Sequence, residues 1–204
     1  MTEAEKFLED HGFVDLNNDD FLSIKNLDIY RIQDMWQIRY SYLQKFGFAV
    51  ASTEAIQAIA KLSPLLEIGA GCGYWTYELL KAGADCTAID TQTGKYLMDN
   101  KDTSMQYWTN FWTKIRKVDA SFAVKRNPDT NLLFCWPDYD VSWPTKALAA
   151  SKCQYVVYIG EGSGGCTGDD RFHEILAEQF EEVEYIRIPQ FYGLHDVLTI
   201  HRRK

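Results

Sequence analysis

Three glycines and one aspartate near the middle of the chain have the types and spacing of a nucleoside-binding site. Gly69, Gly71 and Gly73 alternate through a short turn, and Asp90 follows about 20 positions later. Glycine has no Cβ atom, so the backbone of such a turn can lie directly against a ligand. A carboxylate at that distance is suited to accept hydrogen bonds from ribose hydroxyls. The pattern therefore indicates a ligand that contains a nucleoside.

Apolar runs on both sides of the glycines predict the elements that position these residues. Residues 65–68 and 86–89 are short apolar runs typical of buried parallel strands. A helical pattern follows the glycines and ends at Gly83. This arrangement places the glycine turn and Asp90 at the carboxyl ends of neighbouring strands, where doubly wound sheets bind their ligands.

Residue 74 argues against a dinucleotide ligand. A dinucleotide site is expected to read G-x-G-x-x-G, and the position of its last glycine holds Tyr74. A nicotinamide or flavin site is therefore the weaker interpretation. A third interpretation is that the glycine turn has a purely structural role and binds no ligand.

Residues 67–73, with Glu67 ahead of the three glycines, resemble the first motif of the Rossmann-like methyltransferases that use S-adenosylmethionine (SAM). The resemblance implies that SAM is the co-substrate, with no metal ion. It implies cofactor contacts from Glu67, Gly69, Ala70, Gly71, Gly73, Asp90 and Thr91.

Further cofactor contacts are expected outside this unit. Asp119 and Ala120 resemble the third motif of the same family, in which an acid accepts from the adenine amino group, a donor that suits a carboxylate. A helix cap is the alternative role for Asp119. Phe46, in the helical lead-in, and Trp136, after the fourth strand, are also expected to contact SAM. Ordinary helix packing is the alternative for Phe46.

Residues 136–139 follow the predicted fourth strand and resemble the D/N-P-P-Y/F motif of amino-group methyltransferases. The chain departs from that motif, because Trp136 replaces the Asp or Asn and Asp138 replaces the second Pro. Asp138 is a candidate to orient or deprotonate the acceptor, and Tyr139 to stack on it. Glu161, in a glycine-rich loop expected to face the substrate, is a third candidate acid or base.

The order of predicted elements indicates an α/β fold. Residues 63–204 predict a Rossmann-like, seven-stranded, mostly parallel sheet with helices on both faces and a C-terminal antiparallel hairpin, formed by residues 183–188 and 197–200. Residues 1–62 predict a helical lead-in, with helices over 26–46 and 55–62. A helix is also expected within the aromatic segment 91–114. The whole chain of 204 residues is expected to form one domain.

Composition restricts the partners. The net charge of −8 and the lack of a basic stripe make duplex nucleic acid an unlikely partner and favour a small-molecule or protein acceptor. Five scattered cysteines without C-x-x-C predict neither a disulfide framework nor a zinc site, so the cytoplasm is the expected compartment. No apolar run approaches the ~18 residues of a membrane span. An acidic turn after residue 15 lacks the glycine and glutamate of a calcium loop.

Together these features predict a SAM-dependent methyltransferase that acts on an N or O nucleophile of an unidentified acceptor. The C-terminal elements also resemble a branch of small methyltransferase-like proteins, which implies no particular substrate. Because residues 136–139 are altered, a non-catalytic SAM-binding module, regulatory or sequestering, is the alternative. The oligomeric state is left open.

Overall fold

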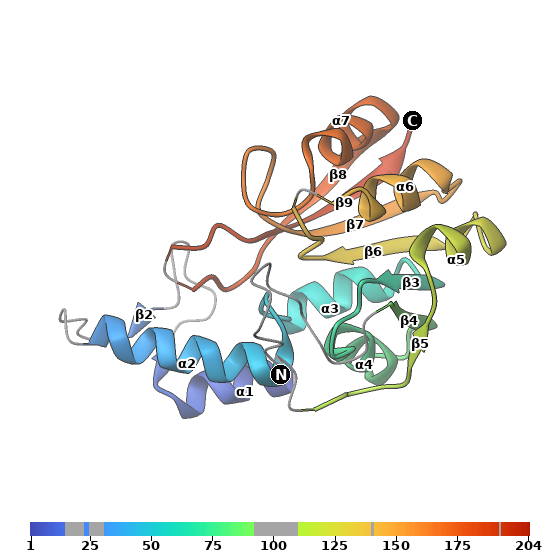
Figure 1. Cartoon of the computed structure of the whole chain (residues 1–204). Helices are drawn as coiled ribbons and strands as arrows, with labels where there is room; N and C mark the ends of the chain where they lie inside the picture. The colour runs from blue at the N-terminus through green and yellow to red at the C-terminus, as the bar shows by residue number, and fades with distance from the viewer. Residues whose placement is uncertain (15–22, 25–30, 92–109, 140, 192) are drawn as a thin grey trace, which may run out of the picture.

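The computed structural model describes residues 1–14, 23–24, 31–91, 110–139, 141–191 and 193–204 (Figure 1). The acidic turn after residue 15 and most of the aromatic segment 91–114 lie outside the described residues. Residues 110–114, which are described, have no helical structure, so the helix expected in that segment is not found at its end.

A seven-stranded sheet forms the centre of the molecule (Figure 1). Its strands lie in the order β5-β4-β3-β6-β7-β9-β8. Six of them run in the same direction, and only β9, which is antiparallel to both β7 and β8, runs the opposite way. The bounds are β3 (Leu65–Ile68), β4 (Cys86–Asp90), β5 (Ile115–Lys117), β6 (Asn131–Cys135), β7 (Tyr155–Gly160), β8 (Phe180–Arg187) and β9 (Val197–Arg203).

The expected α/β Rossmann-like sheet with a closing antiparallel hairpin is confirmed. The hairpin is longer than predicted, because β8 starts at Phe180 directly after the preceding helix and β9 continues to Arg203. From β3 the chain builds outward through β4 to β5 and then returns to place β6 on the other side of β3. This reversal creates a switch point at the carboxyl ends of β3 and β6, where open α/β sheets leave a crevice for ligands.

Helices cover both faces of the sheet, as predicted. One apolar core joins the sheet to α3 (Thr53–Ala60) and α4 (Tyr74–Lys81), and the other joins it to α5 (Ala120–Arg126), α6 (Trp143–Ala150) and α7 (Asp170–Gln179). Side chains of β6 alternate between the cores: Leu133 belongs to the first, and Leu132 and Phe134 to the second. This alternation is the period of two that a strand buried on both faces requires.

The lead-in contains α1 (Glu3–Asp10), α2 (Arg31–Phe46) and a short antiparallel pair, β1 (Phe13–Val14) with β2 (Ser23–Ile24). The predicted end of α2 at residue 46 is confirmed, whereas residues 25–30, where its start was expected, lie outside the described residues. The helix predicted over 55–62 begins earlier, at Thr53, because Ser52 caps it by accepting from the Ala55 backbone at 3.2 Å. It ends at Ala60. The division of the single domain into a lead-in, residues 1–62, and a Rossmann-like part, residues 63–204, stays a prediction.

Hydrogen bonds tie α1 to α3 and to α4, the helix that follows the glycine turn. The Glu5 carboxylate, which is buried, accepts from the Thr2 backbone at 2.7 Å, the Thr53 backbone at 2.7 Å and the Thr53 hydroxyl at 2.6 Å. The Tyr74 hydroxyl accepts from the Ala4 backbone at 2.7 Å. Since Tyr74 is the first residue of α4, the lead-in is anchored next to the glycine turn.

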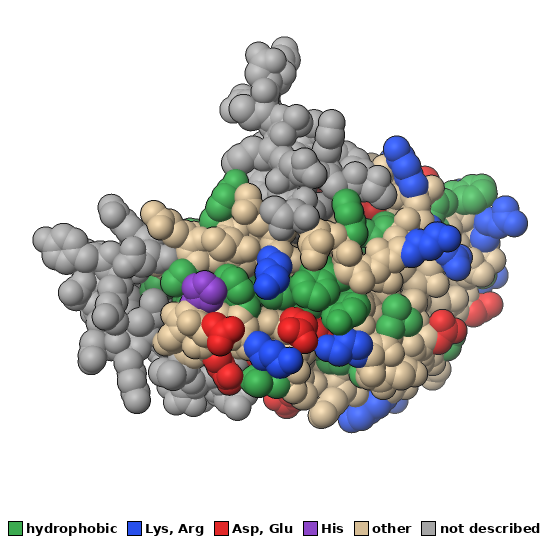
Figure 2. All heavy atoms as spheres, turned by 90° about the horizontal axis from the view of Figure 1, so that it is seen from below, with side chains coloured by type: hydrophobic (Ala, Val, Ile, Leu, Met, Phe, Trp, Pro, Cys, Tyr) green, Lys and Arg blue, Asp and Glu red, His purple; other side chains and the backbone are tan. Residues whose placement is uncertain are grey.

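The outer surface carries charges of both signs. On the face shown in Figure 2, acidic and basic side chains of the described residues are interspersed with apolar ones and form no basic stripe. None of the helices among the described residues is long and apolar enough to cross a membrane.

We predict that Glu5→Ala lowers the free energy of unfolding by about 3 kcal/mol, because three donors lose a charged acceptor in a buried position. Urea denaturation measures the change. Glu9→Ala, at an exposed position of the same helix, is the matched control and is expected to have little effect. Equal losses from the two substitutions would contradict the anchoring role of Glu5.

Candidate functional site

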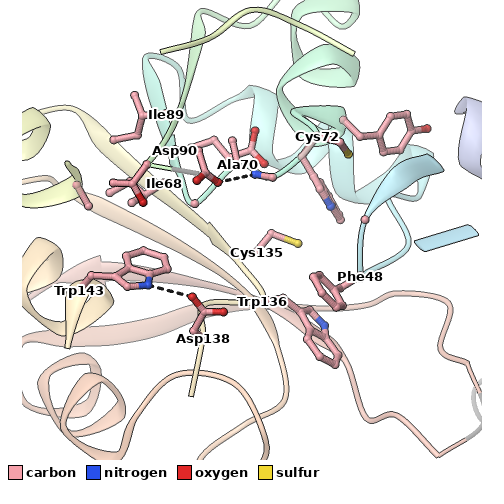
Figure 3. A pocket seen from close by; sticks show the side chains of 18 of the residues that line it. Phe48, Ile68, Ala70, Cys72, Ile89, Asp90, Cys135, Trp136, Asp138 and Trp143 are labelled. Carbon is pink, nitrogen blue, oxygen red and sulfur yellow. Dashed lines mark hydrogen bonds between the residues drawn. The ribbon is translucent and has the colours of Figure 1, made fainter. Parts of the chain in front are cut away.

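A pocket of about 680 Å³ opens at the carboxyl ends of β3, β4 and β6, at the switch point of the sheet (Figure 3). Residues from the lead-in, the glycine turn and the loop after β6 all contribute to it. Its lining consists of Phe46, Gly47, Phe48, Glu67, Ile68, Gly69, Ala70, Gly71, Cys72, Tyr74, Trp75, Ile89, Asp90, Thr91, Val118, Asp119, Ala120, Cys135, Trp136, Asp138, Tyr139, Val141 and Trp143.

The glycine turn requires glycine for two reasons. Gly69, Gly71 and Gly73 have φ values of 71°, 54° and 73°, in the left-handed region that other residues rarely adopt. A Cβ atom on Gly69 would also lie 2.8 Å from the Trp143 ring, and one on Gly73 would lie 2.8 Å from the Thr113 side chain. The turn is therefore closely packed at both glycines. Gly69, Ala70 and Gly71 line the pocket as predicted, together with Cys72, whereas Gly73, which was also expected to contact SAM, is not among the lining residues.

Asp90 stands beside the turn, at the end of β4 as predicted. Its Oδ2 accepts a hydrogen bond from the Gly71 backbone at 2.9 Å. The carboxylate and the turn thus form one unit on the wall of the pocket, with Thr91 next to it. A carboxylate is an acceptor only, so this position suits a ligand that brings hydroxyl donors.

Glu67 lies beneath the turn and is 2% exposed. Its Oε2 accepts from the Thr76 backbone at 3.0 Å and from the Thr76 hydroxyl. Burial, with a smaller contribution from the negative charge of Asp90, raises the pKa of Glu67 to about 7, although the Thr76 hydrogen bonds act to lower it. Glu67 therefore changes its protonation state near neutral pH.

Phe46, Asp119 and Ala120 line the pocket as well. Oδ1 of Asp119 accepts from the Phe122 backbone at 2.9 Å, so the helix-cap interpretation of this residue is confirmed. The adenine contact stays a prediction. Phe46 is buried and packs against Tyr74 with 4.8 Å between ring centroids, which combines ordinary core packing with a place in the lining.

Trp136 forms the opposite wall in a strained backbone conformation. Its φ of 50° makes it the only non-glycine residue with positive φ in the described part of the chain. The indole Nε1 donates to Oδ1 of Asp196 at 2.7 Å, and the ring stacks on Phe48 with centroids 4.9 Å apart and an interplanar angle of 9°. Two segments far apart in sequence therefore hold this side chain in place.

Asp138 and Tyr139 also border the pocket. Oδ2 of Asp138 accepts from Nε1 of Trp143 at 3.1 Å, which orients the carboxylate (Figure 3). Tyr139 is 45% exposed and lies at the rim of the lining. The loop after β6 is held from outside by a β-bridge between Asp138 and Thr167.

Glu161 is not brought together with these residues. It is absent from the lining, and its carboxylate accepts from the backbones of Cys166 at 3.0 Å and His195 at 3.1 Å. Partial burial acts to raise its pKa, yet these hydrogen bonds lower it overall. A fixed, ionised carboxylate with two backbone partners has a bracing role in this structure.

The glycine-rich loop that contains Glu161 contributes no residue to the lining, contrary to the expectation that it faces the substrate. Its glycines allow close packing instead. A Cβ atom on Gly160 would lie 2.5 Å from the Thr167 hydroxyl oxygen, which bonds to Tyr158 at 2.7 Å and accepts from the Glu161 backbone at 2.8 Å. Through Thr167 and Gly168 the loop supports residues 137 and 138 from behind.

Sequence reasoning missed Trp143 and Asp196. Trp143 is the first residue of α6, and no pattern in the sequence shows that its ring lies against Gly69. Ser142 is the N-cap residue of that helix but forms no side-chain cap bond, since its ψ of −2° is not extended. Asp196 is 2% exposed, and burial raises its pKa to about 7. An acid after a long turn gives no signal of a buried partner.

The cysteines and carboxylates of the described residues provide no metal centre. All five cysteines are free, and three of them are buried. Within the described ranges, no group of three or more His, Cys, Asp or Glu side chains is placed to hold a metal ion.

Comparisons with known proteins show similarity in structure and none in sequence. No protein-family model matches the chain, and no curated protein matches it. Magnesium protoporphyrin IX methyltransferase from Synechocystis PCC 6803, solved with bound SAM, is similar over 100% of this chain and 99% of its own, with 9% identity and a TM-score of 0.47.

Two further solved structures are similar at the same level. The Burkholderia thailandensis 1,6-didemethyltoxoflavin-N1-methyltransferase aligns with 89% of this chain and 93% of its own, at 16% identity and a TM-score of 0.45. The N-methyltransferase NodS from Bradyrhizobium japonicum WM9 aligns with 74% of this chain and 94% of its own, at 16% identity and a TM-score of 0.42.

We predict that Glu67→Gln becomes increasingly more stable than the wild type as pH rises from 4.5 to about 7. Because the pKa of Glu67 is raised in the folded state, protonation of this carboxyl stabilises the folded wild type. The wild type loses this contribution to its free energy of unfolding as pH rises through the folded-state pKa. The stability difference between the two proteins is expected to grow by about 3 kcal/mol over this range and then to level off.

Urea unfolding of both proteins at a series of pH values measures the difference. Asp196 titrates in both proteins, so its contribution cancels. Parallel stability curves from pH 4.5 to 8 would show that Glu67 is not a buried, raised carboxyl.

Proposed function

We propose that the protein is a SAM-dependent methyltransferase that transfers a methyl group to an N or O nucleophile of a small-molecule or protein acceptor. One observation carries the proposal. Glu67, residues 69–72 of the glycine turn, Asp90 and Asp119 line a single pocket, in this order along the chain, at the switch point of a Rossmann-like sheet.

The residues of this pocket fit the chemical groups of SAM. Asp90 offers a carboxylate to the ribose hydroxyls, and the turn beside it presents backbone with little side-chain bulk to the amino-acid part. Glu67 lies under that turn, where a carboxyl group suits an ammonium donor. Asp119 and Ala120, at the start of α5, suit the adenine amino group and ring. When bound, SAM supplies an electrophilic methyl group on a positively charged sulfur.

The start of α4 supports SAM over a dinucleotide. Tyr74 occupies the place of the last glycine of the dinucleotide pattern, is 1% exposed and packs against Phe46 and Trp112. Its hydroxyl also holds the Ala4 backbone. In dinucleotide sites the third glycine lets the helix pack closely against the strand. Here the bulky, anchored Tyr74 side chain occupies that position instead.

The wall formed by Trp136, Asp138 and Tyr139 supports methyl transfer rather than cofactor binding alone. Trp136 and Asp138 lie across the pocket from Ala70 and Asp90 (Figure 3), and Tyr139 also lines it. Holding two reactants in line supplies much of the rate of such a transfer, so a strong base is not essential. Five free cysteines support a reducing compartment such as the cytoplasm.

We predict that Asp90→Ala weakens the binding of SAM and S-adenosylhomocysteine (SAH) by roughly 10- to 100-fold, because charge-assisted hydrogen bonds to the ribose are lost. Isothermal titration calorimetry measures both affinities. Asp85→Ala, an exposed position just before the same strand, is the matched control and is expected to bind like the wild type.

Absence of SAM and SAH binding to the wild type, or an unchanged affinity in Asp90→Ala, would refute the proposal. Incubation with radiolabelled SAM and host-cell extract then tests transfer. Binding without label in any fraction would favour the regulatory or sequestering alternative.

A further inference from the structure

The charge of the pocket is one-sided. Of the described residues that line it, four carry carboxyl groups and none is Lys, Arg or His. The four are Glu67, Asp90, Asp119 and Asp138. Arg39 acts on Asp196 behind the Trp136 ring, but neither of these two residues lines the pocket. A ligand in the pocket therefore meets negative charge with no compensating cation among the described lining residues.

Aromatic rings make up much of the remaining lining. Seven of the residues are aromatic: Phe46, Phe48, Tyr74, Trp75, Trp136, Tyr139 and Trp143. Ring faces attract cations and stack on planar groups, and both attractions strengthen when water is excluded. Carboxylates and ring faces together favour a planar ligand that carries or acquires positive charge.

The carboxylates are divided between two walls. Asp90 lies with Ala70 and Cys72 on one wall, and Asp138 lies with Trp143 and Trp136 on the other (Figure 3). The proposed cofactor contacts use Glu67, Asp90 and Asp119, so Asp138 remains for the acceptor. Trp143 fixes the direction of the Asp138 carboxylate by its hydrogen bond of 3.1 Å.

The wall around Asp138 is rigid enough to select a ligand. Trp136 is held by the hydrogen bond to Asp196 and by stacking on Phe48. Tyr139, 45% exposed, lies at the open end. An acceptor ring can lie against fixed aromatic faces with one edge toward Asp138, without first ordering flexible side chains.

The electrostatics of the reaction separate acceptor classes. Transfer to a neutral nitrogen moves the positive charge from sulfur to nitrogen, where Asp138 still stabilises it. Transfer to a carboxylate or phosphate oxygen cancels the charge, so the acidic wall would lose its interaction as the bond forms. An anionic acceptor would also be repelled on entry, because the described lining offers it no cation.

We propose, on the basis of the methyltransferase function above, that the acceptor is a neutral amine or nitrogen heterocycle that becomes a cation on methylation. Its nitrogen lone pair forms the new C–N bond while the electron pair of the C–S bond goes to sulfur, which leaves neutral thioether. The positive charge then rests on nitrogen beside Asp138, and any proton on that nitrogen passes to Asp138 or water. Carboxylic acids and phosphate-bearing molecules do not fit the acidic lining that the described residues form.

Three probes of one ring size test the inference on SAH-saturated protein at pH 8: N-methylquinolinium (a cation), quinoline (neutral) and quinaldate (an anion). Equilibrium dialysis measures each affinity. We expect the cation to bind at least about tenfold more tightly than the anion, with quinoline between them. A difference of this size is what one charge-assisted contact, here with Asp138, provides. In Asp138→Asn, which keeps an acceptor for Trp143, this ratio is expected to fall by about tenfold while SAH affinity stays unchanged.

Glu174→Gln is the matched control, because it changes the net charge equally on an exposed part of α7, at 58% side-chain exposure, outside the pocket. The wild-type ranking tests the acceptor class, and the ratio in Asp138→Asn tests whether Asp138 determines it. Two results would overturn the inference about the acceptor: anion binding to the wild type as tight as cation binding, or an equal fall of the cation-to-anion affinity ratio in Glu174→Gln and Asp138→Asn. In either case, SAH binding would still support the methyltransferase proposal. Failure of SAH to bind would overturn both.

Discussion

The left-handed backbone of the glycine turn is the constraint on which the rest of the site depends. Three consecutive reversals at Gly69, Gly71 and Gly73 bring the chain from β3 into α4 with almost no side-chain volume. The Gly71 backbone donates to Asp90, and the Trp143 ring lies against Gly69. Through these two contacts the turn is held against β4, by Asp90, and against α6, by Trp143. It therefore fixes the distance between the two walls of the pocket.

The second wall has a different origin. The loop after β6 keeps Trp136 in a positive-φ conformation that its side chain disfavours, and the surrounding contacts supply the compensation. Asp196 and Phe48 hold the indole, while the glycine-rich loop supports Asp138 through Thr167. Strain of this kind is typical of functional sites. It explains why residues with no place in the pocket, among them Asp196, matter for its shape.

Most of the fold was predictable, because β3, β4 and their helix follow local rules: apolar runs, a glycine turn and a helix stop at Gly83. The contacts that shape the site were not. Trp143 and Asp196 act through tertiary packing, which leaves no spacing pattern in the sequence. Glu161 is the opposite case, since an acid in a glycine-rich loop suggests chemistry, yet its carboxylate lies outside the pocket lining and accepts hydrogen bonds from the Cys166 and His195 backbones.

The most direct test of the central claim is a crystal structure of the complex with SAH. The account predicts SAH in the pocket between the glycine turn and the Trp136 wall. Its adenine is expected at Asp119, its ribose hydroxyls at Asp90 and its sulfur facing Asp138 across the open space. SAH bound elsewhere, or bound with adenine toward Trp136, would contradict it.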